Sequence, residues 1–235
     1  MPSARPTFRA FAVLLASVGL SLSAHAQAPS APSARFVVVL DAAHGGDDSG
    51  GRLASGQSEK AATLALSVRL RSLLAARGIA VVTTRESDAA LDAGARAAIA
   101  NHARAEACLS LHATESGSGL HLFTSSLAPT RANRFLPWKT AQSAYVARSI
   151  ALAGALNASL RQAGFNVTLS RTALTAVDSM TCPALAVELA PERSADGAVA
   201  AEPDNAAYQA RVAAALASAL LEWRTDPNRI GPSQP

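Results

Sequence analysis

The feature that most constrains the fold is an uninterrupted apolar run, Phe36-Val37-Val38-Val39-Leu40, followed by a segment with a helical period. A continuous β-branched run is typical of a strand that is buried on both faces. From Ser58 to Arg77, apolar residues recur at helical spacing, and Gly78 is a suitable stop signal. These two segments predict a strand followed by a helix.

The alternation of strands and helices continues along the chain. Further strands are predicted at 79–84, 107–112, 119–125, 167–170 and 184–189, and further helices at 92–103, 140–163 and 205–223. Alternation of this kind predicts the α/β class, with one domain over residues 35–223 built around a mostly parallel sheet. Hydrophobic residues make up 49% of the sequence, which is enough for a core of that size. In such sheets, functional sites form beyond the carboxyl ends of the strands.

The first 26 residues have the pattern of a secretory signal peptide. Two arginines precede a short apolar stretch at 10–22, and Ala24-His25-Ala26 offers small residues for cleavage near Ala26-Gln27. A membrane anchor is disfavoured because the apolar stretch is shorter than the roughly 20 residues that span a bilayer. Residues 27–34 are expected to be a linker and 224–235 a flexible tail. The mature protein is therefore expected to be periplasmic or exported, without membrane insertion.

Charge and cysteine content limit the partners and the compartment. The net charge is +4 without any basic run, so a nucleic-acid partner is not expected. Cys108 and Cys182 could pair in an oxidising compartment, or could both be buried thiols. The sequence leaves these two alternatives open.

Four residues with metal or acid–base chemistry fall at ends of the predicted elements. His44 follows the first strand, His112 ends the third, Glu188 lies near the end of the strand at 184–189, and Glu59 begins the first helix. Two imidazoles and one carboxylate are a common zinc ligand set that leaves a fourth position for water, and a further carboxylate can act as the base. Each residue also has an ordinary explanation, such as a surface histidine or a helix N-terminal acid. Spacing does not decide between them, because the chain has no His-Glu-x-x-His signature.

Four sequence blocks occur in a characteristic order: Val38-Val39-Leu40-Asp41-Ala42-Ala43-His44-Gly45-Gly46, Ser58-Glu59-Lys60, Ser110-Leu111-His112-Ala113 and Pro183-Ala184-Leu185-Ala186-Val187-Glu188. Together they resemble the zinc-dependent N-acetylmuramoyl-L-alanine amidases that cut bacterial peptidoglycan. The resemblance implies a six-stranded sheet flanked by helices and one zinc ion held by His44, Glu59 and His112. It also implies Glu188 as the catalytic residue, and peptidoglycan or a muropeptide as the substrate. The bond cut would be the amide between the lactyl group of N-acetylmuramic acid and L-alanine.

The chain departs from the family pattern in two places. Ala43 stands where the family usually has Gly, which is tolerable if its backbone angle is ordinary. The stretch after Glu188 also differs, and this concerns the shape of the wall beside that residue. Two alternatives remain: a zinc peptidase of similar fold acting on another amide, and a non-catalytic peptidoglycan-binding descendant. The stretch at 127–139 is expected to be either a lid or a regulatory insert. The sequence does not tell which activator protein, if any, the enzyme has.

Several other polar or aromatic residues receive simpler interpretations. Asp48-Ser49-Gly50-Gly51 resembles a serine-protease motif, but that class is all-β and places its serine late in the chain. His102 is expected to be exposed, and Trp138 and Trp223 are expected to be packing residues. His121 is expected to be exposed, with a position facing the substrate as the alternative. Asp41 would orient a ligand histidine or end a strand. Arg96 would hold Glu188, a substrate carboxylate or a structural partner.

Overall fold

The computed structural model describes Met1 and residues 35–131 and 135–226. The predicted signal peptide and linker, apart from Met1, lie outside the described residues, and so does the tail from residue 227. The helices and strands all belong to one compact unit that begins at Ala34. None of the described helices is long and apolar enough to span a membrane.

A six-stranded sheet forms the centre of this unit. Its order is β2-β1-β3-β6-β4-β5, and all neighbouring pairs are parallel except β4 with β6, which is antiparallel. The strands are β1 (Val37–Ala42), β2 (Ala80–Thr83), β3 (Ala107–Ala113), β4 (Leu120–Ser125), β5 (Val167–Thr172) and β6 (Ala184–Leu189). The predicted α/β class and mostly parallel sheet are confirmed.

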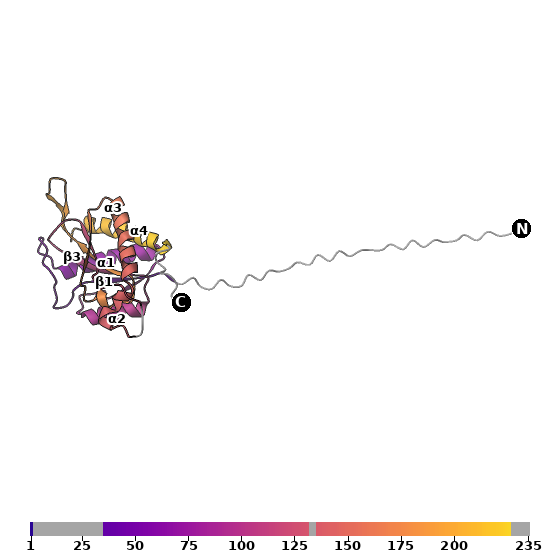
Figure 1. Cartoon of the computed structure of the whole chain (residues 1–235). Helices are drawn as coiled ribbons and strands as arrows, with labels where there is room; N and C mark the ends of the chain where they lie inside the picture. Colours follow the sequence, from indigo (N-terminus) through magenta and orange to yellow (C-terminus); the bar gives the residue numbers. More distant parts are fainter. Residues whose placement is uncertain (2–34, 132–134, 227–235) are drawn as a thin grey trace. The chain divides into compact units, whose positions relative to one another are not determined.

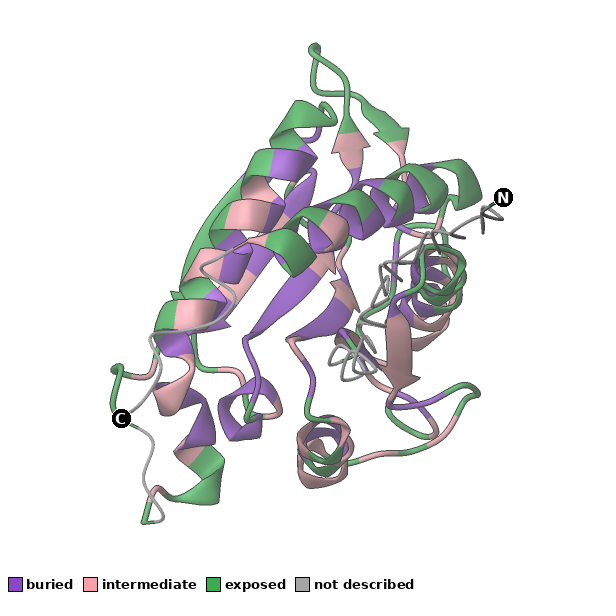
Figure 2. Cartoon of the chain, turned by 90° about the vertical axis from the view of Figure 1, so that its right-hand side faces the viewer, coloured by how far each residue is buried: buried purple, intermediate pink, exposed green. Residues whose placement is uncertain are grey.

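Helices cover both faces of the sheet (Figure 1). The helices α1 (Glu59–Ala76), α3 (Val146–Gln162) and α4 (Ala206–Thr225) pack together on one face, and α2 (Ala93–Ala103) lies on the other. Val38 and Leu40 of β1 enter the larger apolar core and Val39 enters the smaller one beside α2. The β-branched run is therefore buried on both faces, as its composition predicts, and Figure 2 shows buried residues concentrated in the strands and on the helix sides that face them.

The predicted helix at 140–163 is wrong at its start. A 3₁₀ helix, η1 (Trp138–Ala144), is kinked at Thr140 and precedes α3. The buried amide of Gln142 explains the break, because its Nε2 reaches carbonyls of a neighbouring segment, including Met180 O at 3.0 Å. Within α3, Leu152 is fully buried, whereas Ile150 is 44% exposed.

Three short elements carry no clear signal in the sequence. They are the 3₁₀ helix η2 (Val177–Ser179) and the hairpin strands β7 (Glu192–Arg193) and β8 (Val199–Ala201). The two tryptophans differ in burial. Trp223 is fully buried, as expected of a packing residue, whereas Trp138 is 61% exposed and does not pack in the core.

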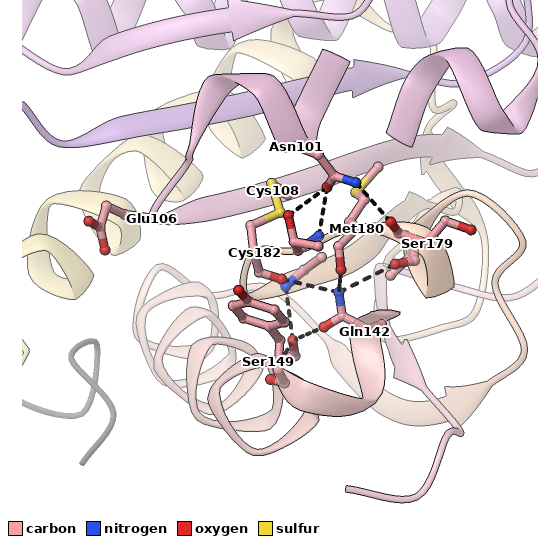
Figure 3. Close-up of a disulfide and its surroundings, with 12 residues drawn as sticks. Asn101, Glu106, Cys108, Gln142, Ser149, Ser179, Met180 and Cys182 are labelled. Atoms are coloured by element: carbon pink, nitrogen blue, oxygen red, sulfur yellow. Dashed lines mark hydrogen bonds between the residues drawn. A yellow bond between two sulfur atoms is a disulfide. The ribbon is translucent and has the colours of Figure 1, made fainter. Parts of the chain in front are cut away.

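The two cysteines form a disulfide, which decides between the alternatives that the sequence leaves open. The bond links the beginning of β3 to the segment that precedes β6 (Figure 3). Asn101 of α2 supports the same segment, since its Nδ2 donates to Ser179 O at 3.0 Å and its Oδ1 accepts from Thr181 N at 2.7 Å. Covalent and polar links thus tie the segment that precedes β6 to β3 and α2.

Candidate metal centre and active site

His44 lies in the loop after β1 and has a left-handed backbone conformation, with φ of 62°. Two buried guanidinium groups hold this loop. Arg96 donates to Ala42 O at 2.8 Å and to His44 O at 2.7 Å, while Arg85 donates to Ala42 O at 2.8 Å and to Ala43 O at 2.9 Å. These bonds satisfy carbonyls that no strand partner reaches, so the turn that presents His44 is fixed by side chains from distant segments.

In this loop the positive φ belongs to His44, whereas the φ of Ala43 is not positive. Ala43 therefore needs no glycine, and this departure from the family pattern is tolerated. Gly50 shows why a glycine is needed elsewhere in the loop. A Cβ on Gly50 would lie 2.6 Å from Cδ2 of His44 and 2.7 Å from Oε2 of Glu59, so no side chain fits there.

Glu59 begins α1 and lies between the two histidines. Its Oε2 is 3.1 Å from Nε2 of His44 and accepts from Gly51 N at 2.9 Å. Its Oε1 is 2.9 Å from Nδ1 of His112 and accepts from Ala113 N at 3.2 Å. Every contact of the carboxylate comes from a donor, which fixes its orientation towards the two imidazoles.

The donor atoms of these three residues fit one zinc ion. One ligand atom from each of His44, Glu59 and His112 lies within 4.8 Å of the others. Atoms held at zinc-ligand distances in a tetrahedron are about 3.3–3.6 Å apart. Glu59 lies 2.9 Å from His112 through Oε1 and 3.1 Å from His44 through Oε2, so small side-chain shifts would bring the three donors to that spacing. The histidine side chains are 23% and 32% exposed, so the open side of the group faces solvent.

Both imidazoles have a second partner that orients the ring. Asp48 Oδ2 lies 2.8 Å from Nδ1 of His44. Ser110 Oγ lies 3.4 Å from Nε2 of His112 and donates to Asp41 Oδ2 at 2.8 Å. Asp41 therefore contacts the candidate ligand His112 only through Ser110.

These contacts shift the pKa values of the three groups in the directions expected where acidic and imidazole side chains pair. Burial would raise the pKa of the Glu59 carboxyl, but hydrogen bonds from His112, His44 and Gly51 outweigh it and hold that pKa far below its ordinary value. The hydrogen bond to Glu59 raises the pKa of His44, against the effect of burial. A hydrogen bond from His44 lowers the pKa of Asp48. The site thus concentrates negative charge around the two imidazoles.

Arg96 is a structural residue and does not hold Glu188. Its Nη1 pairs with Asp41 Oδ1 at 2.7 Å, and both side chains are almost completely buried. Thr84 donates to the same oxygen at 2.7 Å. Of the alternatives stated for Arg96, the structure therefore selects the ion pair. His102 ends α2 and is exposed, as expected.

Glu188 lies on β6 in register with His112 of the neighbouring parallel strand β3. On its other side, β4 places His121 in antiparallel register with it, and Nδ1 of His121 is 2.7 Å from Oε2 of Glu188. The expectation that His121 is exposed is wrong, because its side chain is only 18% exposed. Its alternation with Leu120 and Leu122 indicates a sheet face, but the sequence does not reveal that β4 pairs with β6.

A cavity of about 500 Å³ opens beside the candidate metal-binding group of His44, Glu59 and His112, called the metal-binding group below. His44, Asp48 and His112 line one side of it, and residues 173–177 line another. Ala186 of β6, two residues before Glu188, also faces this space. The cavity could thus accept a substrate that reaches the three donor residues.

The unusual stretch after Glu188 forms part of the hairpin β7–β8. Leu189 and Ala190 are buried, while Arg193 is exposed and its Nε donates to Gly117 O at 3.4 Å. In the region at 127–139, residues 132–134 lie outside the described part, and Phe135 and Trp138 are strongly exposed. The expectation of a lid or a regulatory insert there stays a prediction.

Comparison with known proteins places this geometry in a family. The family model described as N-acetylmuramoyl-L-alanine amidase matches residues 38–222. The chain is 32% identical over 108 residues to the N-acetylmuramoyl-L-alanine amidase AmiC of Neisseria meningitidis, over 43% of this chain and 26% of that protein. It is 40% identical over 90 residues to an endolysin of Bacillus phage SPP1, over 37% of this chain and 33% of that protein. The aligned regions thus span about a quarter to a third of the length of these two relatives.

The fold is also similar to that of solved structures. The apo form of the N-acetylmuramyl-L-alanine amidase Ami1 from Mycobacterium abscessus matches with a TM-score of 0.65 and 20% identity, over 81% of this chain and 99% of that one. The family match covers the sheet, the helices around it and all four residues singled out at the element ends. The chain therefore belongs to the N-acetylmuramoyl-L-alanine amidase family.

Proposed function

We propose that this protein hydrolyses the amide between the lactyl group of N-acetylmuramic acid and L-alanine in peptidoglycan or a muropeptide. The observation that carries the proposal is the meeting of His44, Glu59 and His112 around one point, with Glu188 in register beside His112. Three donors that leave a fourth position open, next to a further carboxylate, are the arrangement that metal-assisted amide hydrolysis requires.

In this proposal, His44, Glu59 and His112 would hold one zinc ion, and that ion would supply a Lewis acid for the hydrolysis. Glu188 performs the proton transfers. Its carboxylate takes a proton from the attacking water and then delivers that proton to the alanine nitrogen as the carbon–nitrogen bond breaks. The products are a free lactyl carboxylate and an intact stem peptide with a free amino terminus.

The proposed location is outside the cytoplasm, either periplasmic or exported. The disulfide between Cys108 and Cys182 supports it, since disulfides persist mainly in oxidising compartments. Signal cleavage near Ala26 is part of the same proposal. Amino-terminal sequencing of the protein recovered from the periplasm or the medium tests it, and an intact Met1 terminus on that protein would contradict it.

The decisive experiment is digestion of purified sacculi, followed by mass spectrometry of the released material. New lactyl carboxylates with intact stem peptides are expected. Cuts within the peptide would indicate the zinc peptidase instead. Binding of the protein to sacculi without release of peptides would indicate the non-catalytic binder. Glu188→Gln should keep the zinc content and lower turnover by about 10²–10⁴-fold. Persistent lysis by that variant would remove Glu188 from its assigned role. His112→Ala should lose zinc, while the exposed-residue variant His102→Leu should match the unmodified protein.

A further inference from the structure

A histidine that the proposed reaction does not yet use lies directly against Glu188. Paired positions on neighbouring strands point to the same face of a sheet, so His112, Glu188 and His121 form a row across β3, β6 and β4. Nδ1 of His121 is 2.7 Å from Oε2 of Glu188, a short distance for a nitrogen and a carboxylate oxygen. Glu188 therefore has one neighbour in the metal-binding group and another outside it.

The surroundings of His121 leave its ring little freedom. Phe123, two residues along β4 on the same face, meets the ring edge-on, with centroids 6.2 Å apart and an interplanar angle of 81°. Gly117 closes another side, since a Cβ there would lie 2.6 Å from Cε1 and 3.0 Å from Nε2 of His121. The loop before β4 thus approaches the imidazole so closely that only glycine fits, and the ring is held with Nδ1 directed at Glu188.

The two oxygens of Glu188 are consequently not equivalent. Oε2 accepts from His121, whereas Oε1 has no hydrogen-bond partner within the described part of the chain. A carboxylate that must gain and then release a proton needs one oxygen free for this transfer. A hydrogen bond to the other oxygen fixes the direction in which the free oxygen points.

We infer that His121 is a positioning residue of the proposed amidase reaction, holding Oε2 of Glu188 so that Oε1 faces the scissile amide. The inference rests on the proposed function and adds one residue to it. The proton from the attacking water moves to Oε1 of Glu188 and from there to the alanine nitrogen as the carbon–nitrogen bond breaks. His121 keeps its Nδ1 proton throughout, so it neither gains nor loses charge.

The test compares His121→Leu, which removes the donor, with His121→Asn, whose amide nitrogen takes the place of Nδ1. With a soluble muropeptide, His121→Leu should lower kcat by about 10- to 100-fold, as loss of an orienting partner does at other sites, with KM changed less than about threefold. His121→Asn should recover most of the lost kcat. His102→Leu, which replaces an exposed histidine at the end of α2, is the matched control and should keep the unmodified kcat.

Two readouts do not depend on turnover. Zinc content should stay at the unmodified level in both His121 variants, and nitrogen-15 NMR of the unmodified protein should show a proton on Nδ1 of His121. An unprotonated Nδ1, loss of zinc in His121→Leu, or equal damage in the Leu and Asn variants would overturn the inference. If His121→Leu does not fold, judged by its melting curve, the Asn variant and the NMR measurement decide.

The same experiment separates this inference from the proposed function. If Glu188→Gln is inactive but His121→Leu keeps full kcat, only the role of His121 is refuted. If the unmodified protein releases no stem peptide at all, the proposed function is refuted, and the NMR measurement still reports whether His121 donates to Glu188.

Discussion

Replacing Cys108 and Cys182 together by alanine should lower the free energy of unfolding by about 4 kcal/mol and leave catalysis intact. The two cysteines are 74 residues apart in the sequence, and the loop between them contains β4, α3 and β5. For a loop of that length, the chain-entropy relation gives about 4 kcal/mol at 25 °C. Both side chains are about 1% exposed, so the alanines stay within the core.

Catalysis should persist because the disulfide lies at the other end of the strand from the site. Cys108 is four residues before His112 on β3, about 13 Å along a strand. The pairing of β3 with β6 continues from Cys108–Ala184 to Ala113–Leu189 without help from the bond. The row that contains His112 and Glu188 should therefore survive in the folded variant.

Urea unfolding followed by circular dichroism measures the loss, and the sacculus assay below the melting range measures activity. Reduction of the unmodified protein should reproduce the stability of the double alanine variant, and reductant should not change that variant further. A loss below about 1 kcal/mol would refute the loop-entropy argument. A fall in kcat of more than a few-fold in the folded variant would refute the claim that the site is independent of the bond.

Three further predictions concern the loop of His44 and the metal-binding group. Arg96→Met should destabilise the protein by about 3–5 kcal/mol in urea unfolding, because the buried carboxylate of Asp41 loses its counter-ion. Arg71→Met is the control, since the exposed ion pair of Arg71 contributes at most about 1 kcal/mol. Gly50→Ala should weaken zinc binding in a chelator competition by at least about tenfold. Gly56→Ala, whose new Cβ would be 3.9 Å from its nearest neighbour, should leave zinc binding unchanged, and equal affinities of the two variants would contradict the steric argument. Zinc at 100 times its dissociation constant should stabilise the folded protein by about 2.7 kcal/mol; this gain should vanish in His112→Ala, and a gain that persists would place the metal elsewhere.

Local patterns in the sequence were sufficient for most of the architecture. The run at 36–40 encodes a strand with two buried faces, and Val38 and Val39 do enter different cores. Helical spacing with Gly78 as a stop encodes α1, which ends at Ala76. Such patterns depend on a residue and its near neighbours, so they can be recognised without knowledge of the fold. The placement of His44, Glu59, His112 and Glu188 at element ends follows from the same patterns.

The partners of these residues could not be predicted in the same way. His121 was assigned to the surface because its antiparallel partner, Glu188, is 67 residues away in the sequence. The kink before α3 depends on carbonyls about 35–40 residues beyond Gln142.

The sequence by itself therefore determined the α/β alternation, the strand with two buried faces and the four residues at the element ends, since each is encoded by local periodicity and end signals. Only the tertiary structure decided that Cys108 pairs with Cys182, that Arg96 pairs with Asp41, and that His121 lies within hydrogen-bond distance of Glu188. The physical reason is that a hydrogen bond or an ion pair between distant segments depends on how the strands are ordered in the sheet. That order results from packing of the whole core, and no single segment encodes it.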